Sequence, residues 1–524
     1  MSNVQSMTNT HYPIFKKISS LSKKNKIPVY VVGGFVRDYL LGREEKKDID
    51  FVVEGSGVAF AKLFDEAIKG KGRLVEFAQF DTARYIFLDE NRQVELEIEF
   101  AGARKELYRD TSRKPAVEPA ALEEDLSRRD FTVNALAIEV GDWPPLLSKE
   151  GIRGGLPSGA DTRDSAKDGK PRPTLPLEKG RRLRRGGNLI DPYNGSQDLK
   201  DKVLRTPLDP DVTFSDDPLR MLRAVRFAGQ LGFSIVPQAL EAIYRNRERI
   251  KIVSAERVQE ELLKILALPQ PSVGLLLMFQ THLMDVILPE LSALDGVDEV
   301  YGRIHKNNFI HSLMVVDNIA LRSDNVMLRL AGLLHDIGKA PTKRYVRPIG
   351  WTFHQHEHVG KKMAYQIAKR LRLSNDDTAY AAKLVRWHLQ PIQLMDEGIT
   401  DSAIRRLIVN MGDMLDDLLI LGRSDITTGH PQKKVKYLGN YDRLEKHVAE
   451  VIEKDKMRAF QSPVRGDEIM KITGLKPGPK VGEVKKAIEE AILDGMIPNE
   501  YEAAMKYLLQ MKGIMIKKDE DKMI

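Results

Sequence analysis

Two acidic residues near the N-terminus have the spacing of a metal-binding pair. Asp48 and Asp50 flank Ile49 in the run DIDFVV, which is typical of a short strand. Side chains alternate between the two faces of a strand, so both carboxylates are expected on one face, about 6–7 Å apart. Two such oxygen ligands can hold one or two Mg²⁺ ions for phosphoryl transfer. Alone, the pattern is more often only a polar strand end.

A glycine pair precedes these carboxylates. Gly33 and Gly34 follow an apolar run at 28–32 and precede the helical run FVRDYLLG. Because glycine has no Cβ and the first N–H groups of a helix are unpaired, phosphate groups can approach the backbone closely at such a junction. The pair therefore indicates a candidate triphosphate site beside the carboxylates.

A second set of metal-ligand residues lies in the C-terminal half. His335 and Asp336 end the apolar helical run LRLAGLLHDIGK, where a charged pair is costly unless it binds a ligand or water. Imidazole together with carboxylate favours Mn, Ni, Co, Fe or Zn over Mg alone. The other candidate members of this set are His311, His356, His388 and Asp425.

The order of several motifs carries a family resemblance. GGFVRDYLLG is followed by DIDF, RRDFTVNALAI, DPYNGSQDL and DDPLRMLRAVRFA. This series resembles the class II tRNA nucleotidyltransferase and poly(A) polymerase family over about residues 28–268. The resemblance implies a nucleotidyltransferase head, a helical neck and body, and metal-dependent addition of nucleotides to an RNA 3′ end. It also implies that Asp48 and Asp50 are catalytic residues that bind Mg²⁺.

The resemblance extends to residues that would contact the incoming nucleotide. Asp217 and Arg220 match the pair that reads the Watson–Crick edge of CTP and then ATP, while Asp216 stands where the family usually has Glu. The expected nucleotide-binding residues are Gly33, Gly34, Arg37, Arg128, Arg129, Asp130, Asn134, Asp217, Arg220, Arg223 and Arg226.

Structural interpretations of the same motifs stay open. Glu99 best fits a third catalytic carboxylate, but the glutamates of VELEIEF also read as the solvated face of a strand. Asp130 fits the cap of a helix formed by FTVNALAI. The arginines of RMLRAVRF recur every three residues, which is also typical of a solvated basic stripe on a helix.

The histidine set resembles the HD-domain phosphohydrolases over residues 307–428. A metal bound there would supply a hydroxide for phosphoester hydrolysis. His354 and His358 flank His356, so spacing does not decide which of the three is a ligand. The resemblance implies one divalent metal held by His311, His335, Asp336 and Asp425, with His356 and His388 completing a second site.

The pattern along the chain predicts an α+β fold. We expect a mixed-sheet nucleotidyltransferase head with helices at 1–205, an all-α neck and body for RNA and nucleobase recognition at 206–300, an all-α HD domain at 301–450 and a helical C-terminal tail at 451–524. Residues 143–187 are rich in Gly, Pro, Ser, Arg and Lys. Such a composition cannot bury a core, so we expect a basic insertion without fixed structure.

Composition narrows the choice of partners. The 524 residues include 82 Lys and Arg against 75 Asp and Glu, a net charge of +7, which permits a polyanionic partner such as tRNA. Cysteine is absent, which excludes a disulfide-linked partner, thiolate zinc sites and a cysteine nucleophile. No run approaches the ~18–20 apolar residues of a membrane span. We expect a cytoplasmic protein without a membrane partner, and the oligomeric state stays open.

Together, these features predict addition of CCA to the 3′ end of tRNA, with CTP and ATP as substrates and Mg²⁺ at the nucleotidyltransferase site. A second divalent metal (Mg, Mn, Ni, Co, Fe or Zn) at the HD site would support a secondary phosphohydrolase activity. The alternatives are an A-adding, CC-adding or poly(A)-adding enzyme of the same family. A further alternative is an HD phosphohydrolase whose N-terminal half only binds RNA.

Overall fold

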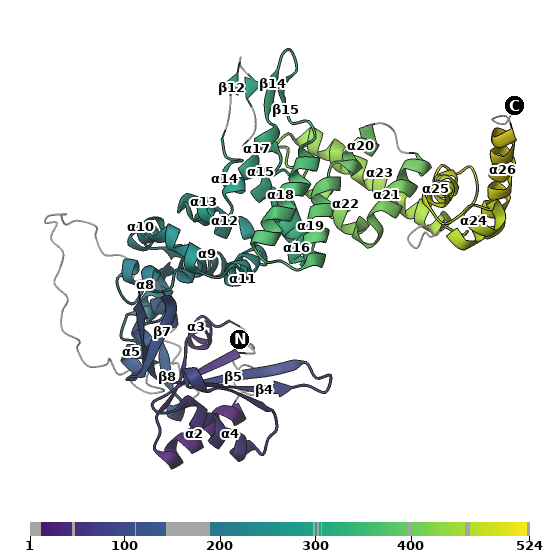
Figure 1. Ribbon diagram of the computed structural model, residues 1–524. Helices are drawn as coiled ribbons and strands as arrows, with labels where there is room; N and C mark the ends of the chain where they lie inside the picture. The colour runs from purple at the N-terminus through teal and green to yellow at the C-terminus, as the bar shows by residue number, and fades with distance from the viewer. Residues whose placement is uncertain are drawn as a thin grey trace. The chain divides into compact units, whose positions relative to one another are not determined.

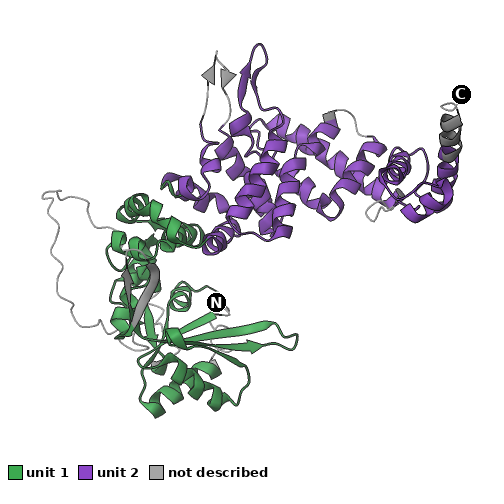
Figure 2. Ribbon diagram, in the orientation of Figure 1, with its two compact units in different colours: residues 1–254, 281–283 green, residues 255–280, 284–524 purple. Residues whose placement is uncertain are grey.

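The chain folds into two compact units, each with its own core (Figures 1 and 2). One unit contains residues 1–254 and 281–283, and the other contains residues 255–280 and 284–524. The division at residue 254 lies inside the segment that the sequence suggested as one neck and body. The structure, a computed structural model, describes residues 12–43, 48–109, 112–142, 189–296, 299–300, 303–304, 307–396, 400–455 and 462–520.

The first unit is built on a mixed sheet, as predicted. Seven of its described strands run in the order β3-β4-β5-β2-β1-β8-β9 (Figure 1). Strands β2 and β5 are parallel, and the other neighbouring pairs are antiparallel. The strands are β1 (Val29–Val32), β2 (Asp48–Val53), β3 (Arg73–Phe77), β4 (Thr82–Leu88), β5 (Val94–Gly102), β8 (Ala137–Glu139) and β9 (Leu189–Ile190).

Aromatic packing fixes which face of the sheet is covered. Helices α2 (Tyr12–Asn25) and α4 (Gly57–Ile68) lie against one face (Figure 1). On that face the ring centroids of Phe51 and Phe100 are 5.4 Å apart, and Phe60 and Phe64 each lie 5.4 Å from Phe100. Since neighbouring residues of a strand point to opposite faces, the side chain of Asp50, which precedes Phe51, lies on the other face.

The run FTVNALAI does not form the predicted helix. It forms a short 3₁₀ turn, η2 (Thr132–Asn134), followed by strand β8 between β1 and β9. Ala137 and Ile138 point to opposite faces of the sheet and both are buried. An interior strand covered on both faces reads as a continuous apolar run, which periodicity cannot distinguish from a buried helix.

Short elements connect the sheet to a helical end of the same unit. The predicted insertion at 143–187 lies outside the described residues. The connecting elements are α3 (Gly34–Leu40), hairpin β6 (Arg104–Arg109) and β7 (Ser112–Pro119), α5 (Leu122–Ser127) and α7 (Gly195–Asp201). The helical end contains α8 (Pro210–Asp216), α9 (Leu219–Leu231) and α10 (Pro237–Asn246), with the parallel pair β10 (Val203–Leu204) and β11 (Ser234–Ile235).

The second unit is helical, as predicted for the HD region. Its core gathers apolar residues of α15, α16, α19, α21, α22 and α23, including Val315, Leu384, Leu407 and Leu418. The helices are α11 (Ala255–Leu266), α12 (Pro271–Gln280), α13 (Leu283–Ile287), α14 (Pro289–Ser292), α15 (Asn308–Ala320), α16 (Val326–Leu334), α17 (Lys339–Thr342), α18 (His356–Arg370), α19 (Asn375–Trp387), α20 (Gln390–Asp396), α21 (Asp401–Met411), α22 (Leu415–Ser424) and α23 (Pro431–Asp455). Two short hairpins interrupt them, β12 (Glu299–Val300) with β13 (Arg303–Ile304), and β14 (Arg344–Val346) with β15 (Gly350–Thr352).

The C-terminal region is helical, with a small core of its own. Helices α24 (Gly466–Thr473), α25 (Pro479–Leu493) and α26 (Tyr501–Glu520) pack around Ile469, Val484, Ile488 and Leu508. Within the described segments, no helix of either unit combines the length and the apolar character that crossing a membrane requires.

Candidate functional site

The predicted carboxylate pair lies on the face of the sheet opposite α2 and α4. Asp48 and Asp50 are exposed, whereas Ile49 between them is buried, which confirms the predicted alternation. The parallel register places Glu99 of β5 directly beside Asp50, and neighbouring strands lie about 4.8 Å apart. Asp48, Asp50 and Glu99 therefore share one region of this face with Glu97, which lies beside Asp48.

Sequence reasoning missed the cation that accompanies Glu99. Arg84 of β4 stands opposite Glu99, and its Nε donates a hydrogen bond to Oε2 of Glu99 at 2.9 Å. Its Nη1 lies 3.2 Å from Oε1 of Glu97. Burial lowers the pKa of Arg84, but the hydrogen bond to Glu99 and the two glutamate charges raise it overall. Glu99 is thus a paired carboxylate and not simply a solvated one, because Arg84 balances its charge.

Gly33 brings a carboxylate and a guanidinium together. Its φ of 73° lies in the left-handed region that favours glycine. A Cβ at this position would lie 2.9 Å from Nη1 of Arg129 and 3.6 Å from Oδ2 of Asp50. The absent side chain therefore leaves the backbone open between Asp50 and Arg129, as expected where a phosphate approaches. Gly34 begins α3.

A buried carboxylate that the sequence did not reveal anchors both arginines of the RRD motif. Asp125 is 0% exposed, and its carboxylate accepts hydrogen bonds from Arg128 at 2.5 Å and from Arg129 at 3.3 Å. Burial raises the pKa of Asp125, but the charges of Arg129 and Arg128 outweigh burial and lower it. Nε of Arg129 is buried without a hydrogen-bond partner among the described residues. This guanidinium therefore retains a donor that its protein partners leave unsatisfied.

Asp130 lies at the centre of a second buried network. Nε and Nη2 of Arg223 donate to its Oδ2 at 2.8 and 2.5 Å, and Asn134 donates to Oδ1 at 2.9 Å. Burial raises the pKa of Asp130, but Arg223 and the hydrogen bond from Asn134 lower it to about 2. Nη1 of Arg37 donates to Oδ1 of Asn134 at 2.7 Å. Arg37, Asp130, Asn134 and Arg223, all predicted site residues, thus form one hydrogen-bond network.

Arg37 differs from its prediction as a nucleotide contact. Its side chain is 1% exposed and its guanidinium also donates twice to Asp38 at 2.9 Å. The guanidinium lies 5.1 Å from the ring centroid of Phe227 on α9. A cation enclosed in this way supports Asn134 and Phe227 of α9, so the structure places it in the framework behind the site.

The predicted arginine stripe of α9 is not a solvated surface. Arg220 is 9% exposed, and its Nη2 donates to the backbone carbonyl of Arg128 at 2.6 Å. Arg223 is held by Asp130, and Arg226 lies 4.1 Å from the Phe227 ring centroid. Asp217 precedes the helix and accepts a hydrogen bond from the backbone N–H of Leu219 at 3.4 Å. Arg220 and Arg223 therefore tie α9 to the RRD motif.

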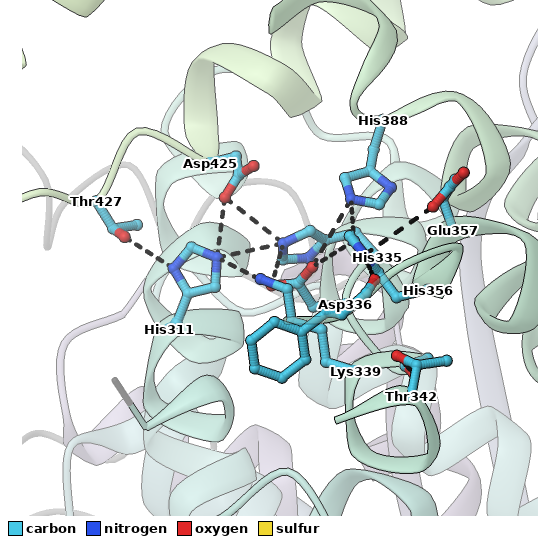
Figure 3. Close-up of polar contacts among 12 residues, drawn as sticks. His311, His335, Asp336, Lys339, Thr342, His356, Glu357, His388, Asp425 and Thr427 are labelled. Carbon is cyan, nitrogen blue, oxygen red and sulfur yellow. Dashed lines mark hydrogen bonds and ion pairs between the residues drawn. The ribbon is translucent and has the colours of Figure 1, made fainter. Parts of the chain in front are cut away.

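The predicted HD residues form a second, separate cluster in the other unit (Figure 3). Two groups could each hold a metal ion, one of His311, His335 and Asp425 and the other of Asp336, His356 and His388. Within each group the ligand atoms all lie within 4.8 Å of one another.

All four imidazoles present Nε2 to the centre of this cluster. Nε2 of His311 lies 3.2 Å from that of His335, and Nε2 of His356 lies 3.4 Å from that of His388. Each Nδ1 is engaged outside: carbonyls of Gly332, Phe353 and Val385 accept at 2.7–2.9 Å, and Oγ1 of Thr427 lies 2.7 Å from His311. A histidine that is hydrogen-bonded through one nitrogen is oriented to bind a metal through the other.

Asp336 connects the two groups. Its Oδ2 lies 3.3 Å from His335 and 3.5 Å from His311, while its Oδ1 lies 3.4 Å from His356 and 3.7 Å from His388 (Figure 3). Burial raises the pKa of Asp336, but the charges of His335 and Lys339 hold it well below its usual range. An ionised carboxylate with one oxygen on each side suits a bridge between two metal ions.

The surroundings shift the pKa values of His335 and His388 in opposite directions. Burial lowers the pKa of His335, but the charges of Asp336 and Asp425 raise it to about 10. Burial and the charge of His335 lower the pKa of His388 to about 4. The structure also resolves the ambiguity around His356, which is 7% exposed and faces His388, whereas His354 and His358 are exposed.

Lys339 is a member of the site that the sequence analysis missed. Its Nζ lies 2.6 Å from Oδ2 of Asp336. The signal was present in HDIGK, because a residue three positions after Asp336 faces it within one helical turn. Lys339 therefore supplies a positive charge at the edge of the two metal-ligand groups.

Comparisons with known proteins match the regions of the chain in which the two candidate sites lie. Family models match in three places: "Poly A polymerase head domain" at 29–147, "Probable RNA and SrmB- binding site of polymerase A" at 232–294 and "HD domain" at 308–420. The A-adding tRNA nucleotidyltransferase of Deinococcus radiodurans is 32% identical over 396 residues, 74% of this chain and 78% of the relative. The chain belongs to the tRNA nucleotidyltransferase and poly(A) polymerase family.

Other relatives of this nucleotidyltransferase have different named activities. The CC-adding tRNA nucleotidyltransferase of Thermus thermophilus is 31% identical over 63% of this chain and 74% of the relative. The Multifunctional CCA protein of Hahella chejuensis is 30% identical over 66% and 68%. The CCA-adding enzyme of Bacillus stearothermophilus, solved with CTP, has a TM-score of 0.63 at 20% identity over 98% of this chain and all of that chain, which confirms the expected fold.

Proposed function

We propose that this nucleotidyltransferase adds CCA to the 3′ end of tRNA, using CTP and then ATP. The observation that carries the proposal is the meeting of Asp50, Gly33 and the incompletely bonded Arg129. A metal ion and a triphosphate need this combination of carboxylate, bare backbone and guanidinium. The +7 net charge suits tRNA as the partner, and we place the protein in the cytoplasm.

The proposed roles follow the positions of the side chains. Asp48 and Asp50 would hold Mg²⁺, which supplies charge neutralisation for the attacking 3′-hydroxyl and the departing pyrophosphate. Glu99 is the third carboxylate of the same face. Arg128 and Arg129 would bind the triphosphate, oriented by the buried Asp125. These assignments rest on donor chemistry and geometry, and Asp48 and Asp50 remain exposed enough to bind both ion and substrate.

Base selection is assigned to the start of α9. Asp217 and Arg220 offer acceptor and donor groups for the base edge. One N–H of Arg220 is already bound to the carbonyl of Arg128, so the remaining N–H groups of this guanidinium would face the base. This bond supports a template of fixed position, because the same arginine is tied to the motif that binds the phosphates.

Extension of defined tRNA ends tests the proposal. Transcripts that lack CCA, CA or A are incubated with Mg²⁺ and with CTP, ATP or both. CCA addition predicts two C residues followed by one A, and Asp48→Asn with Asp50→Asn abolishes all incorporation. Growth by A alone, by C alone or into long A tails assigns the chain to an A-adding, CC-adding or poly(A)-adding activity instead.

A second function is proposed for the histidine cluster, a metal-dependent phosphoester hydrolysis. The convergence of four Nε2 atoms and two carboxylates carries this proposal. Because the ligands are imidazole and carboxylate, Mn, Ni, Co, Fe or Zn suits the cluster better than Mg alone. A bound ion supplies an acidic water near neutral pH, and Lys339 would neutralise the phosphate.

Hydrolysis of p-nitrophenyl phosphate with each metal tests this second function. We expect activity with one or more of these ions, with a loss of at least about 100-fold in His335→Ala and no loss in Asp48→Asn/Asp50→Asn. Absence of hydrolysis with every ion contradicts it. Loss of both hydrolysis and nucleotide addition in His335→Ala supports the alternative of a single HD centre.

A further inference from the structure

The segment that joins two ligands of the histidine cluster has an unusual composition. Residues 337–355 lie between Asp336 and His356 and contain Lys339, Lys343, Arg344 and Arg347 but no acidic residue. They also contain a tyrosine, a tryptophan and a phenylalanine. The segment forms α17 and the hairpin β14–β15, which projects from the helices of its unit (Figure 1).

Cations and aromatic rings alternate along one face of this hairpin. Tyr345 and Trp351 are direct cross-strand partners, with ring centroids 5.3 Å apart. Nζ of Lys343 lies 4.7 Å from the Trp351 ring centroid. All three side chains are half-buried, so part of each is accessible. Interleaved cations and aromatic rings are typical of surfaces that bind single-stranded nucleic acid, since each base offers a face for stacking.

The same face leads directly to the histidine cluster. Nζ of Lys339 lies 2.6 Å from Oδ2 of Asp336 and 5.7 Å from the ring centroid of Phe353. Phe353 directly follows β15, and its carbonyl accepts from Nδ1 of His356. A single-stranded nucleic acid whose bases stack on the hairpin would therefore have its phosphates next to Lys343 and its terminus next to Lys339.

A purely structural role explains only part of this pattern. Each strand has three residues, and an isolated two-stranded hairpin is marginally stable. The Tyr345–Trp351 pair stabilises it across the strands. That role requires no cations, yet Arg344 at the base of the hairpin and Arg347 at its turn are both exposed.

We propose that the β14–β15 hairpin is a docking surface for single-stranded RNA, which it guides by its phosphorylated end to the histidine cluster. Bases stack on Tyr345 and Trp351, and Lys343 and Arg347 bind the backbone phosphates. Delivery of the RNA end for hydrolysis rests on the proposed phosphohydrolase function. Binding of RNA to the hairpin does not require hydrolysis.

A fluorescence experiment tests the binding directly. The chain has three tryptophans, so Trp143→Phe with Trp387→Phe leaves Trp351 as the only indole. We titrate this variant with a five-residue oligoadenylate that carries a 3′-phosphate, and we expect quenching that weakens as salt rises. Lys343→Gln in this background lowers the affinity about 3- to 10-fold. Lys361→Gln/Lys362→Gln, an exposed pair on α18, leaves it unchanged.

Hydrolysis provides the second readout. The wild-type protein should have a lower KM for the oligonucleotide than for 3′-AMP. Trp351→Ala with Lys343→Gln should raise the KM for the oligonucleotide about 10-fold and leave turnover of p-nitrophenyl phosphate unchanged. If that variant does not fold, Arg347→Gln tests the same surface with its aromatic pair intact and should raise the oligonucleotide KM alone.

The outcomes separate this inference from the function on which it rests. Quenching without hydrolysis of any ester overturns the phosphohydrolase proposal and supports the docking surface. Hydrolysis that is equal for oligonucleotide and 3′-AMP, together with no quenching of Trp351, overturns the docking surface alone. An equal loss with all substrates in the hairpin variants also overturns it, because the hairpin would then only support His356 and Lys339.

Discussion

Asp125 shows how one buried side chain can control two functional ones. Its carboxylate binds Arg128 and Arg129, and no solvent reaches it. Arg129 in turn lies next to Gly33 and Asp50. Because a displacement of about 1 Å can cost on the order of 100-fold in rate, the position of this carboxylate should matter as much as that of the groups that touch substrate.

We predict that Asp125→Asn lowers kcat/KM for CTP about 10- to 100-fold. The amide has nearly the same shape but no charge to hold two guanidiniums, so the free energy of unfolding should also fall by about 2 kcal/mol. Steady-state extension of tRNA and urea denaturation measure the two effects. Glu123→Gln makes the same carboxylate-to-amide change at an exposed position of α5 and should leave both quantities unchanged. Equal losses in the two variants would show that Asp125 has no special role.

Sequence spacing pointed to the residues that we propose act on the ligands directly, but not to those that position them. Asp48 and Asp50 were found because a strand period of two puts their carboxylates on one face, which the structure confirms. Arg84 and Asp125 were missed, because their significance comes from strand register and from burial. Arg37 was assigned to the nucleotide, yet it is enclosed by Asp38, Asn134 and Phe227. Neither register nor burial can be read from local spacing.

Elements with a clear period were predicted well, and those without one were not. Alternation in VELEIEF predicted β5, and the helical neck and body expected at 206–300 contains α9, α10 and α11. The run FTVNALAI has no useful period because β8 is buried on both faces. Its pairing partner β1 lies more than 100 residues earlier in the chain. This non-local pairing makes the segment a strand, and the sequence of the run itself does not indicate it.

Predicting the histidine cluster required less knowledge of the secondary structure. Its ligands lie at or near the ends of α15, α16, α18, α19 and α22, and the helical core between those ends sets their convergence. Residue types therefore sufficed to nominate the set, while the choice of His356 over its neighbours required the direction in which α18 presents its first turn. The hairpin before α18 was not anticipated, because its strands are only three residues long.

At the scale of the whole molecule, the two candidate sites lie in different compact units. The carboxylate site uses residues before 254, and the histidine cluster uses residues after 307. A ligand that binds only the folded form of one unit stabilises that unit by mass action. Metal binding at the histidine cluster should therefore have a thermal signature that the other unit does not share.

We predict two calorimetric unfolding transitions, of which Mn²⁺ raises only one. At about 100 times the dissociation constant, a bound ion stabilises its unit by about 2.7 kcal/mol, and about 2–4 °C per kcal/mol for a unit of this size gives a shift of about 5–10 °C. EDTA should reverse the shift. Asp425→Asn should remove it, because this carboxylate contacts both His311 and His335, whereas Asp48→Asn/Asp50→Asn should keep it. A single transition, or a shift that persists in Asp425→Asn, would mean that the units do not unfold independently or that the ion binds elsewhere.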